Sequence, residues 1–273
     1  MTNNIPTRPV IRYHGGKWIL APWIIKHFPK HRIYVEPFGG AASVLLRKQR
    51  AYSEIYNDLD GDVVNLFRVI RDNGRKLTEQ LQNTPYSRDE FNLSFISTED
   101  PMESARRMVV RAYMGFGSAA ATGRITGFRS NSNKSGTTPA HDWVNYPEAL
   151  KNIIKRLQGV VIENSGAISI MQKADSKSTL HYVDPPYVKN TRYKDGKTIS
   201  YNFELEDQEH IELLESLKLL KGVVVISGYD NKIYNESLCE WYRVERAAYA
   251  DGAAKRKEIL WINKPEHIDK KLF

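Results

Sequence analysis

Residues 33–48, with the sequence IYVEPFGGAASVLLRK, constrain the fold more than any other part of the chain. The first six residues form a short apolar and aromatic run that is typical of a buried strand, and residues 41–48 have the composition of a helix. Gly39 and Gly40 stand between the two, where a tight turn favours glycine. A strand, a glycine turn and a helix predict the start of an α/β unit.

The same alternation continues along the rest of the chain. SEIYND, which ends at Asp58, predicts a second strand, and Val63, Leu66, Phe67 and Ile70 follow it at helical spacing. Later signals predict a helix over 147–157 with Gly159 as its cap, followed by the strand VVIE and then by the strand that enters Asp184. They next predict a helix with Ile211, Leu214, Leu217 and Lys221 that ends at Gly222, and the strand VVVIS at 223–227. WYRVERA and KEILWIN, with no helix between them, predict an antiparallel closing pair. The pattern predicts an α/β fold whose mostly parallel sheet is covered by helices on both faces.

Composition narrows the class of protein. The chain has 273 residues, of which 41% are apolar and 26% charged, as in ordinary folded proteins of one large domain or two unequal ones. The 40 Lys and Arg exceed the 32 Asp and Glu, which gives a net charge of +8 and favours a polyanionic partner. Cys239 is the single cysteine, so an internal disulfide framework and a thiolate-rich metal site are excluded, and we expect a buried, inert thiol.

The sequence contains no signal that is typical of a membrane protein or a secreted protein. No apolar stretch is long enough to cross a bilayer, and MTNNIPTRPV lacks the charged start and apolar run of a secretion signal. We therefore expect a cytoplasmic protein without a membrane partner.

Residues 75–146 interrupt the β-α alternation and predict an inserted, mainly helical subdomain. The main domain would then consist of residues 1–74 and 147–273. Between Ser104 and His141 the chain has no Asp or Glu and carries six basic residues: Arg106, Arg107, Arg111, Arg124, Arg129 and Lys134. Such a density of positive charge favours binding to phosphates, because their neutralisation releases counterions. For any single arginine the alternative is a place on a solvated helix face.

Special residues follow three of the expected strands at the edge where parallel sheets bind ligands. Gly39 and Gly40 follow the first strand, Asp58 ends the second and Asp184 ends a later one. A glycine turn admits a ligand to the backbone, and an acid at the next strand end accepts hydrogen bonds from ribose hydroxyls. The glycine spacing does not match the dinucleotide pattern, which opposes a nicotinamide-dependent oxidoreductase, and HGGK lacks full phosphate-loop spacing. An adenosyl ligand without phosphates fits these constraints.

The tetrapeptide Asp184, Pro185, Pro186 and Tyr187 is the strongest chemical signal. Each proline fixes φ and removes an N–H, so the main chain presents a carbonyl acceptor in a stiff frame beside the Asp184 carboxylate. Two acceptors suit an amino group with two hydrogens, and hydrogen bonds out of the base plane localise the nitrogen lone pair for attack. Tyr187 is expected to stack on a base. The alternative is a rigid turn in which Asp184 caps and Tyr187 packs.

Together these segments resemble the DNA adenine-N6 methyltransferases whose cofactor motif precedes the catalytic one. RYHGGK resembles the family's N-terminal element, VEPFGGAASVLL its cofactor motif, YNDLD its ribose-binding acid and DPPY its catalytic tetrapeptide. SGYDN and KEILWIN are also similar to family segments. The resemblance implies a Rossmann-like methyltransferase sheet with an inserted DNA-recognition subdomain, and a role in DNA methylation or restriction-modification, with no protein partner indicated.

The resemblance also implies roles for individual residues. The site for S-adenosylmethionine would contain Tyr13, Lys17, Phe38, Gly40, Asp58, Leu59 and Asp184, and the catalytic residues would be Asp184, Pro185, Pro186 and Tyr187. Candidate DNA-binding residues are Arg111, Arg124, Arg129, Asn131 and Lys134, of which Arg124, Arg129 and Asn131 have side chains suited to base edges. Ala42 departs from the family's glycine, and its methyl group is tolerable only with a negative φ and room for the cofactor.

The expected reaction is direct transfer of a methyl group to N6 of an adenine rotated out of double-stranded DNA, with no metal and no covalent enzyme intermediate. Several alternatives stay open from the residues alone. The same acceptors would serve N4 of cytosine, an RNA base or a glutamine side chain. A DNA-binding relative that has lost turnover, with Ala42 as the lesion, is a further hypothesis.

Overall fold

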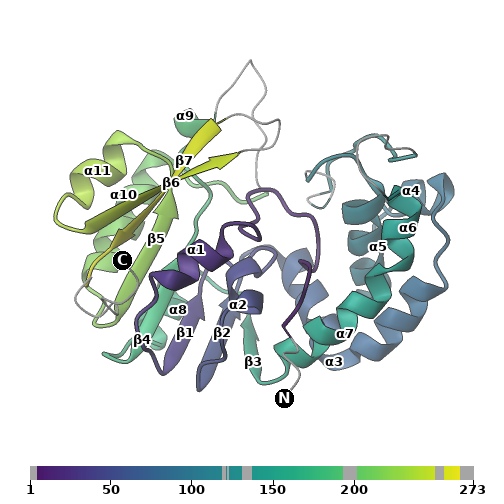
Figure 1. Ribbon diagram of the computed structural model, residues 1–273, viewed down its shortest axis with the longest axis horizontal. Helices are drawn as coiled ribbons and strands as arrows, with labels where there is room; N and C mark the ends of the chain where they lie inside the picture. The colour runs from purple at the N-terminus through teal and green to yellow at the C-terminus, as the bar shows by residue number, and fades with distance from the viewer. Residues whose placement is uncertain are drawn as a thin grey trace. The chain divides into compact units, whose positions relative to one another are not determined.

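The predicted strands form one seven-stranded sheet with the order β3-β2-β1-β4-β5-β7-β6 (Figure 1). The computed structural model describes residues 5–118, 121, 123–130, 137–192, 202–249 and 255–264. The strands are β1 Ile33–Glu36, β2 Ser53–Asn57, β3 Val160–Glu163, β4 Thr179–Val183, β5 Val223–Gly228, β6 Tyr242–Tyr249 and β7 Lys255–Ile262. Pairing is parallel for β1 with β2, β1 with β4 and β4 with β5, and antiparallel for β5 with β7 and β6 with β7. The expected parallel sheet with an antiparallel closing pair is confirmed.

By its internal contacts the chain divides into two compact units. The sheet unit comprises residues 19–39, 48–59 and 163–273, and the helical unit comprises 1–18, 40–47 and 60–162. Helices of the sheet unit are α1 Ala21–Lys26, α8 Ala167–Lys173, α9 Lys189–Arg192, α10 Asp207–Lys218 and α11 Lys232–Ser237. Those of the helical unit are α2 Ser43–Arg47, α3 Gly61–Gln82, α4 Arg88–Leu93, α5 Pro101–Met114, α6 Pro139–Val144 and α7 Tyr146–Leu157.

The sheet unit buries apolar side chains on both faces of its strands. On one face, Val35, Val183, Val224 and Trp261 pack with residues of α8, α10 and α11. On the other, the ring of Phe28, just after α1, lies 6.0 Å from that of Tyr34 and 5.8 Å from that of Tyr182. Burial on both faces explains the nearly continuous apolar runs of these strands.

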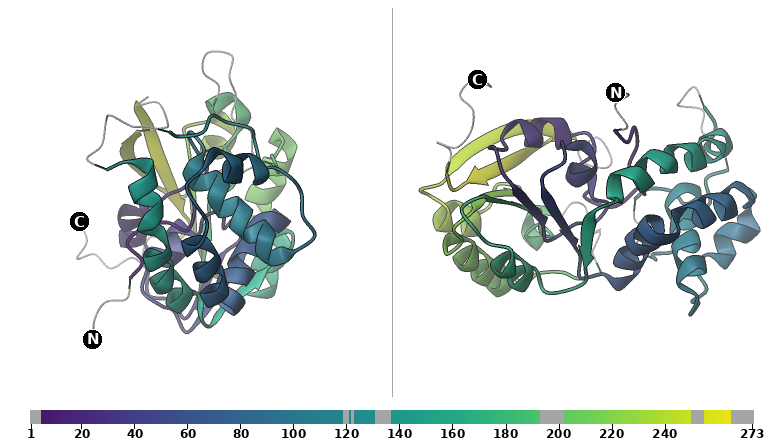
Figure 2. Two further views of the ribbon diagram at one scale, coloured as in Figure 1. Left: turned by 90° about the vertical axis from the view of Figure 1, so that its right-hand side faces the viewer. Right: turned by 90° about the horizontal axis from the view of Figure 1, so that it is seen from below.

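The helical unit is larger than the predicted insertion at 75–146. Its blue and teal helices gather into one bundle in Figure 2, in which both α5 and α7 pack against α3. Because α3 begins at Gly61 and α7 continues to Leu157, the helices that flank the predicted insertion belong to the same unit. The apolar positions Val63, Leu66, Phe67 and Ile70 of α3 are buried, as their spacing predicts.

Two local expectations were wrong. In α10 the buried positions are His210, Leu213, Leu214 and Leu217, whereas Ile211 is 42% exposed and Lys221 lies beyond the helix end. Cys239 is exposed, because it lies in the turn between α11 and β6 while its neighbour Leu238 takes the buried position. Among the described residues, no helix combines the length and the apolarity that crossing a bilayer requires.

Gly74 offers a test of the packing between α3 and α7. A Cβ atom at this position would lie 2.5 Å from Cγ1 and 2.7 Å from Cδ1 of Ile154. Gly74→Ala should therefore lower the free energy of unfolding by about 1–3 kcal/mol through overpacking, although alanine is favoured over glycine in helices by about 1 kcal/mol. Denaturant unfolding measures the change. The double variant Gly74→Ala/Ile154→Ala should lose less than the sum of the single variants, and strict additivity would contradict the clash.

Candidate functional site

The register of β4 and β5 places Asp184 beside Ser227. Val183 is the partner of Ile226 across the parallel pair, so the next residue of each strand lies at the same sheet edge. Ser227 Oγ donates a hydrogen bond of 2.7 Å to Asp184 Oδ1, and Ser227 Oγ is 3.3 Å from the Tyr182 hydroxyl. Asp184 is half-buried and Pro185 is buried. The carboxylate of the DPPY motif is thus held by a neighbouring strand.

Tyr187 is buried and anchored by β7. Its hydroxyl donates to the carboxylate of Glu258, which is 2% exposed, and its ring meets that of Tyr229 edge-on at 4.7 Å. Burial, together with the charges of Asp184 and Glu258, raises the pKa of Tyr187 well above its usual range, so the phenol stays protonated and donates. Because only 6% of Tyr187 is exposed, its stacking on a base remains a prediction.

The ends of β1 and β2 are joined by backbone and side-chain hydrogen bonds. The N–H of Gly39 donates to the carbonyl of Asn57 at 2.8 Å, and a Cβ on Gly39 would lie 2.1 Å from the Tyr56 ring. The Asn57 amide donates to the carbonyls of Pro37 and Ser165, both at 2.9 Å. Only glycine fits between these strand ends, which explains the first glycine of the GG pair.

Asp58 and Leu59 lie in the loop that follows β2. The side-chain amide of Asn164 donates to the carbonyls of both residues, at 2.8 Å and 3.1 Å. Asp58 is half-buried and Leu59 is 52% exposed. The loop is therefore fixed in position while an apolar side chain on it stays accessible.

In the helical unit, the RYHGGK segment contacts the turn before α2. A Cβ on Gly40, whose φ is +45°, would lie 3.3 Å from the Tyr13 ring, and a Cβ on Gly16 would lie 3.8 Å from Ser43 Oγ. Lys17 is 7% exposed, and its Nζ donates to the carbonyl of Gly15 at 3.0 Å. Two motifs that are separated in the sequence thus meet. Among the described residues, the buried Ser43 hydroxyl has no hydrogen-bond partner.

The backbone at Ala42 does not have the negative φ under which its methyl group would be tolerated. Its φ is +52°, in the left-handed region that favours glycine, and its side chain is fully buried. The condition of a negative φ is therefore not met. The Ala42 carbonyl accepts the first helical hydrogen bond of α2, from the N–H of Leu46 at 2.9 Å.

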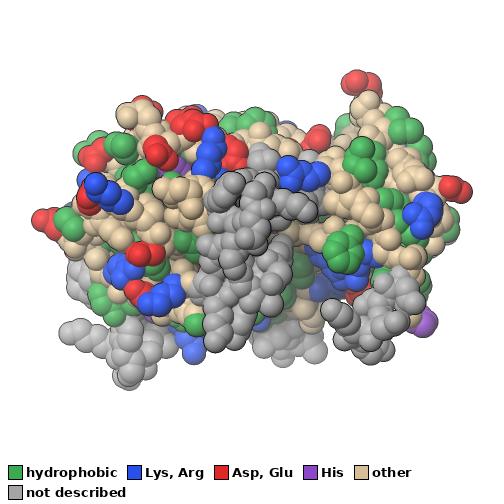
Figure 3. Space-filling model, turned by 90° about the horizontal axis from the view of Figure 1, so that it is seen from above, with side chains coloured by type: hydrophobic (Ala, Val, Ile, Leu, Met, Phe, Trp, Pro, Cys, Tyr) green, Lys and Arg blue, Asp and Glu red, His purple; other side chains and the backbone are tan. Residues whose placement is uncertain are grey.

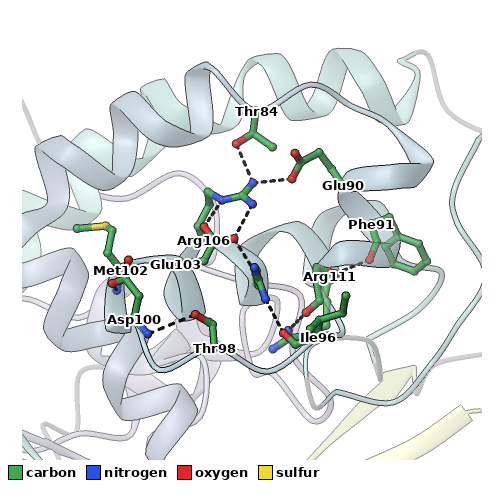
Figure 4. Close-up of polar contacts among 12 residues, drawn as sticks. Thr84, Glu90, Phe91, Ile96, Thr98, Asp100, Met102, Glu103, Arg106 and Arg111 are labelled. Atoms are coloured by element: carbon green, nitrogen blue, oxygen red, sulfur yellow. Dashed lines mark hydrogen bonds and ion pairs between the residues drawn. The ribbon is translucent and has the colours of Figure 1, made fainter.

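Two arginines of the predicted basic cluster have structural partners. Arg106 donates to Glu103 and Glu90, each at 2.7 Å, and to Thr84 at 3.1 Å (Figure 4). Arg107 donates to Glu103 at 2.6 Å. Their side chains are only 11% and 13% exposed. The segment lacks acids of its own, but Glu90 and Glu103 lie just before it in the sequence and pair with it in space.

The other candidate DNA-binding residues have different surroundings. Arg111 donates to the carbonyl of Ser94 and is half-buried. Arg129 donates to the carbonyl of Tyr113 and directly follows Phe128, which forms an isolated antiparallel bridge with Gly115, and Arg124 is exposed. Asn131 and Lys134 lie outside the described residues. On the face drawn in Figure 3, acidic and basic side chains are interspersed over the sheet unit.

Sequence reasoning assigned no role to four residues that support these loops. Ser227 and Glu258 hold Asp184 and Tyr187, and Asn57 and Asn164 hold the strand ends around Asp58. Ser227 was detectable, because it directly follows the apolar run VVVI at a predicted strand end. Glu258 was not, because only the antiparallel register of β7 brings it to the end of β5.

Comparison with known proteins agrees with this arrangement. The sequence profile of the D12 class N6 adenine-specific DNA methyltransferases matches residues 13–251. The chain belongs to this family. It is 26% identical over 283 residues to the DNA adenine methylase of Escherichia coli strain K12, which covers 94% of this chain and 96% of that protein. It is also 26% identical over 290 residues to the Type II methyltransferase M1.LlaDCHI of Lactococcus lactis subsp. cremoris, covering 96% and 97%.

Membership of the D12 class confirms the predicted resemblance and the predicted enzyme class, an adenine-specific DNA methyltransferase with DNA as substrate. The Rossmann-like sheet is confirmed as well. The roles of individual residues remain predictions.

The positive φ of Ala42 predicts that glycine at this position makes the protein more stable. Ala42→Gly should raise the free energy of unfolding by about 1 kcal/mol, because alanine at positive φ costs at least that much relative to glycine. Denaturant unfolding at equilibrium measures it. Ala41→Gly is the matched control: Ala41 is also buried but has a negative φ, so its loss should destabilise the protein by about 0.5–1 kcal/mol. Destabilisation by both substitutions would contradict the strain.

Proposed function

We propose that this methyltransferase transfers a methyl group from S-adenosylmethionine to N6 of an adenine that is rotated out of double-stranded DNA. The observation that carries the proposal is the Asp184 carboxylate, held by Ser227 at the end of β4 in front of two prolines. A family that methylates N6 of adenine supports the choice of amine and of reaction. The DNA substrate agrees with the expected cytoplasmic location.

In the proposed reaction Asp184 and the carbonyl of Pro185 accept the two hydrogens of the adenine amine. These hydrogen bonds strengthen as positive charge develops on the nitrogen, so they stabilise the transition state more than the bound substrate. Ser227 donates to one oxygen of the Asp184 carboxylate, so the sheet, rather than the substrate, fixes the orientation of this carboxylate. Pro186 stiffens the turn, and Tyr187, with its hydroxyl on Glu258, fixes the end of the motif.

Each unit by itself contains some of the residues predicted to bind an adenosyl cofactor. When bound, S-adenosylmethionine supplies an electrophilic methyl group on a sulfonium. In the helical unit the candidates are Tyr13, Lys17 and Gly40, and the fit is supported by the buried Ser43 hydroxyl without a described partner. In the sheet unit they are Phe38, Asp58, Leu59 and Asp184, of which the exposed Leu59 side chain suits an adenine face and the Asp58 carboxylate suits ribose hydroxyls.

Residues 75–146 are the proposed target-recognition segment. Arg124 is exposed on the segment that follows α5, where it can reach a base edge, and Arg129 directly follows the bridge residue Phe128 at the base of that segment. Residue type alone supports Asn131 and Lys134. Contacts to the phosphate backbone would offset the few kcal/mol that rotating a base out of the duplex costs.

Product analysis tests this proposal. The protein is incubated with labelled S-adenosylmethionine and unmethylated duplex DNA, and the digested nucleosides are separated. We expect N6-methyladenine from the wild type, and a loss of about a thousandfold in turnover for Asp184→Ala, because an acceptor that acts in the transition state is removed. Glu212→Ala, which removes an exposed carboxylate of α10, is the control and should be fully active.

Two outcomes would overturn the proposal. Formation of N4-methylcytosine, or of no methylated base, would contradict the assigned reaction. Retention of N6-methyladenine formation by Asp184→Ala would contradict the assigned role of the carboxylate.

Ser227→Ala tests whether the orientation of Asp184 matters. The variant should turn over about tenfold more slowly, since one hydrogen bond to a charged group is worth about 1.5 kcal/mol. The KM for DNA should stay the same, because Ser227 is not proposed to touch DNA. Steady-state kinetics separate the two constants. Ser216→Ala removes an equivalent hydroxyl on α10 as the control, and equal rates for both variants would refute the positioning role.

A further inference from the structure

A pocket of about 240 Å³ lies within the helical unit, between the start of α3, the loop after α4 and one side of α5. Its polar lining includes Asp62, Ser97, Thr98, Ser104, Arg107 and Arg111. Ser104, Arg107 and Arg111 recur along α5 at spacings of three and four residues, so they share one helix face. The pocket is therefore lined by two guanidinium groups and three hydroxyls, opposed by one carboxylate.

Arg111 differs from the other two arginines of α5 in how its charge is balanced. Arg106 and Arg107 each donate to a carboxylate, whereas within the described part of the chain the hydrogen bond of Arg111 goes to the carbonyl of Ser94 (Figure 4). The Arg111 Nε atom is buried and has no partner among the described residues. Burial lowers the pKa of Arg111, and the charges of Asp62 and Asp60 offset this only partly. A buried cation without a directly bonded anion is costly, and an anionic ligand would remove that cost.

We propose that this pocket binds a phosphate group of the DNA backbone, with Arg111 as the principal ligand and with Arg107 and the hydroxyl of Ser104 as further donors. The proposal rests on the proposed function, because it takes its phosphate from the DNA substrate. A phosphate oxygen accepts charge-assisted hydrogen bonds from guanidinium groups, and a serine hydroxyl rotates to donate to another oxygen. Asp62 opposes this ligand, so its carboxylate limits the affinity of the pocket for phosphate.

The carboxylate of Asp62 distinguishes a phosphate from the main alternative ligand, a base edge. A guanine base would use Arg111 as donor and Asp62 as acceptor, and both would then favour binding. A phosphate uses Arg111 but is repelled by Asp62. The two classes therefore predict opposite effects of removing the Asp62 charge.

DNA binding is measured by fluorescence anisotropy with a duplex of mixed sequence at several salt concentrations. Arg111→Met should weaken binding about tenfold, and the slope of log K against log salt should fall by about 0.9, the value for one phosphate contact. Arg68→Met, which removes an exposed arginine of α3 outside the proposed target-recognition segment, is the control and should change both quantities much less. Arg111→Lys should restore part of the affinity. Asp62→Asn should tighten binding.

Further measurements distinguish binding of free phosphate from binding of DNA, and loss of binding from loss of folding. Inorganic phosphate, titrated by calorimetry, should bind only at millimolar concentration and not to Arg111→Met. If Arg111→Met does not fold, as judged by circular dichroism, Ser104→Ala removes a pocket donor without disturbing the arginine and should weaken DNA binding a few-fold, the size expected for one lost hydrogen bond of about 1 kcal/mol.

Four results would overturn the proposal. Equal effects of Arg111→Met and Arg68→Met, in a wild type that binds and methylates DNA, would reject the pocket and leave the proposed function standing. Weaker binding by Asp62→Asn would indicate a base as the ligand. Micromolar binding of inorganic phosphate together with unchanged DNA binding by Arg111→Met would indicate a site for free phosphate. A wild type that neither binds nor methylates DNA would reject both the pocket and the proposed function.

Discussion

The parallel alignment of β1, β2, β4 and β5 is the constraint on which the candidate site depends. Parallel strands point their carboxyl ends to one edge, and there the chain places Pro37, Asn57, Asp184 and Ser227. The register then decides which side chains meet: a shift of β5 by one residue would turn Ser227 to the opposite face and separate it from Asp184. The burial of strand residues on both faces enforces this register, because a slipped strand would have to repack against helices on each side. The packing of the core therefore also determines the orientation of the Asp184 carboxylate.

Much of this edge could be predicted from the sequence. The apolar runs mark strands that are buried on both faces, and glycine, acid and proline mark their ends, so fold class and the residues of the DPPY motif followed from local signals. Support from distant residues did not. Glu258 reaches Tyr187 only through the antiparallel pairing of β7 with β5, and Asn164 reaches the loop at Asp58 only after the chain has passed through the helical unit. Such partners carry no local pattern, because their role depends on register rather than on composition.

The errors of the sequence reasoning concern backbone and burial at single positions. Ala42 has a positive φ in the turn between the GG pair and α2, and residue type alone could not reveal this because alanine rarely adopts that conformation. The spacing of apolar residues correctly predicts a helix at α10, but the predicted buried face includes Ile211, which is exposed. Helical spacing alone identifies the buried face of a helix only when the residues at both margins of that face are apolar. The bounds of the predicted insertion, 75–146, stay a prediction. The flanking α3 and α7 have helix patterns that fit either unit, and only their mutual packing assigns them.

Charge is the property that sequence counts describe least well in this protein. The segment from Ser104 to His141 contains no acidic residue. Counting acidic and basic residues therefore suggests that every arginine in the segment is available to bind DNA. In space, Arg106 pairs with both Glu90 and Glu103, whereas Arg107 shares Glu103 with it, and the Arg106–Glu90 pair joins α5 to α4. A guanidinium bonded to two carboxylates offers a phosphate little net charge, because its field is already cancelled at contact distance. Arg111, one turn after Arg107, bonds a carbonyl and no carboxylate among the residues that the structure describes. The distribution of carboxylates, rather than the number of arginines, selects which cation of this helix can bind an anion.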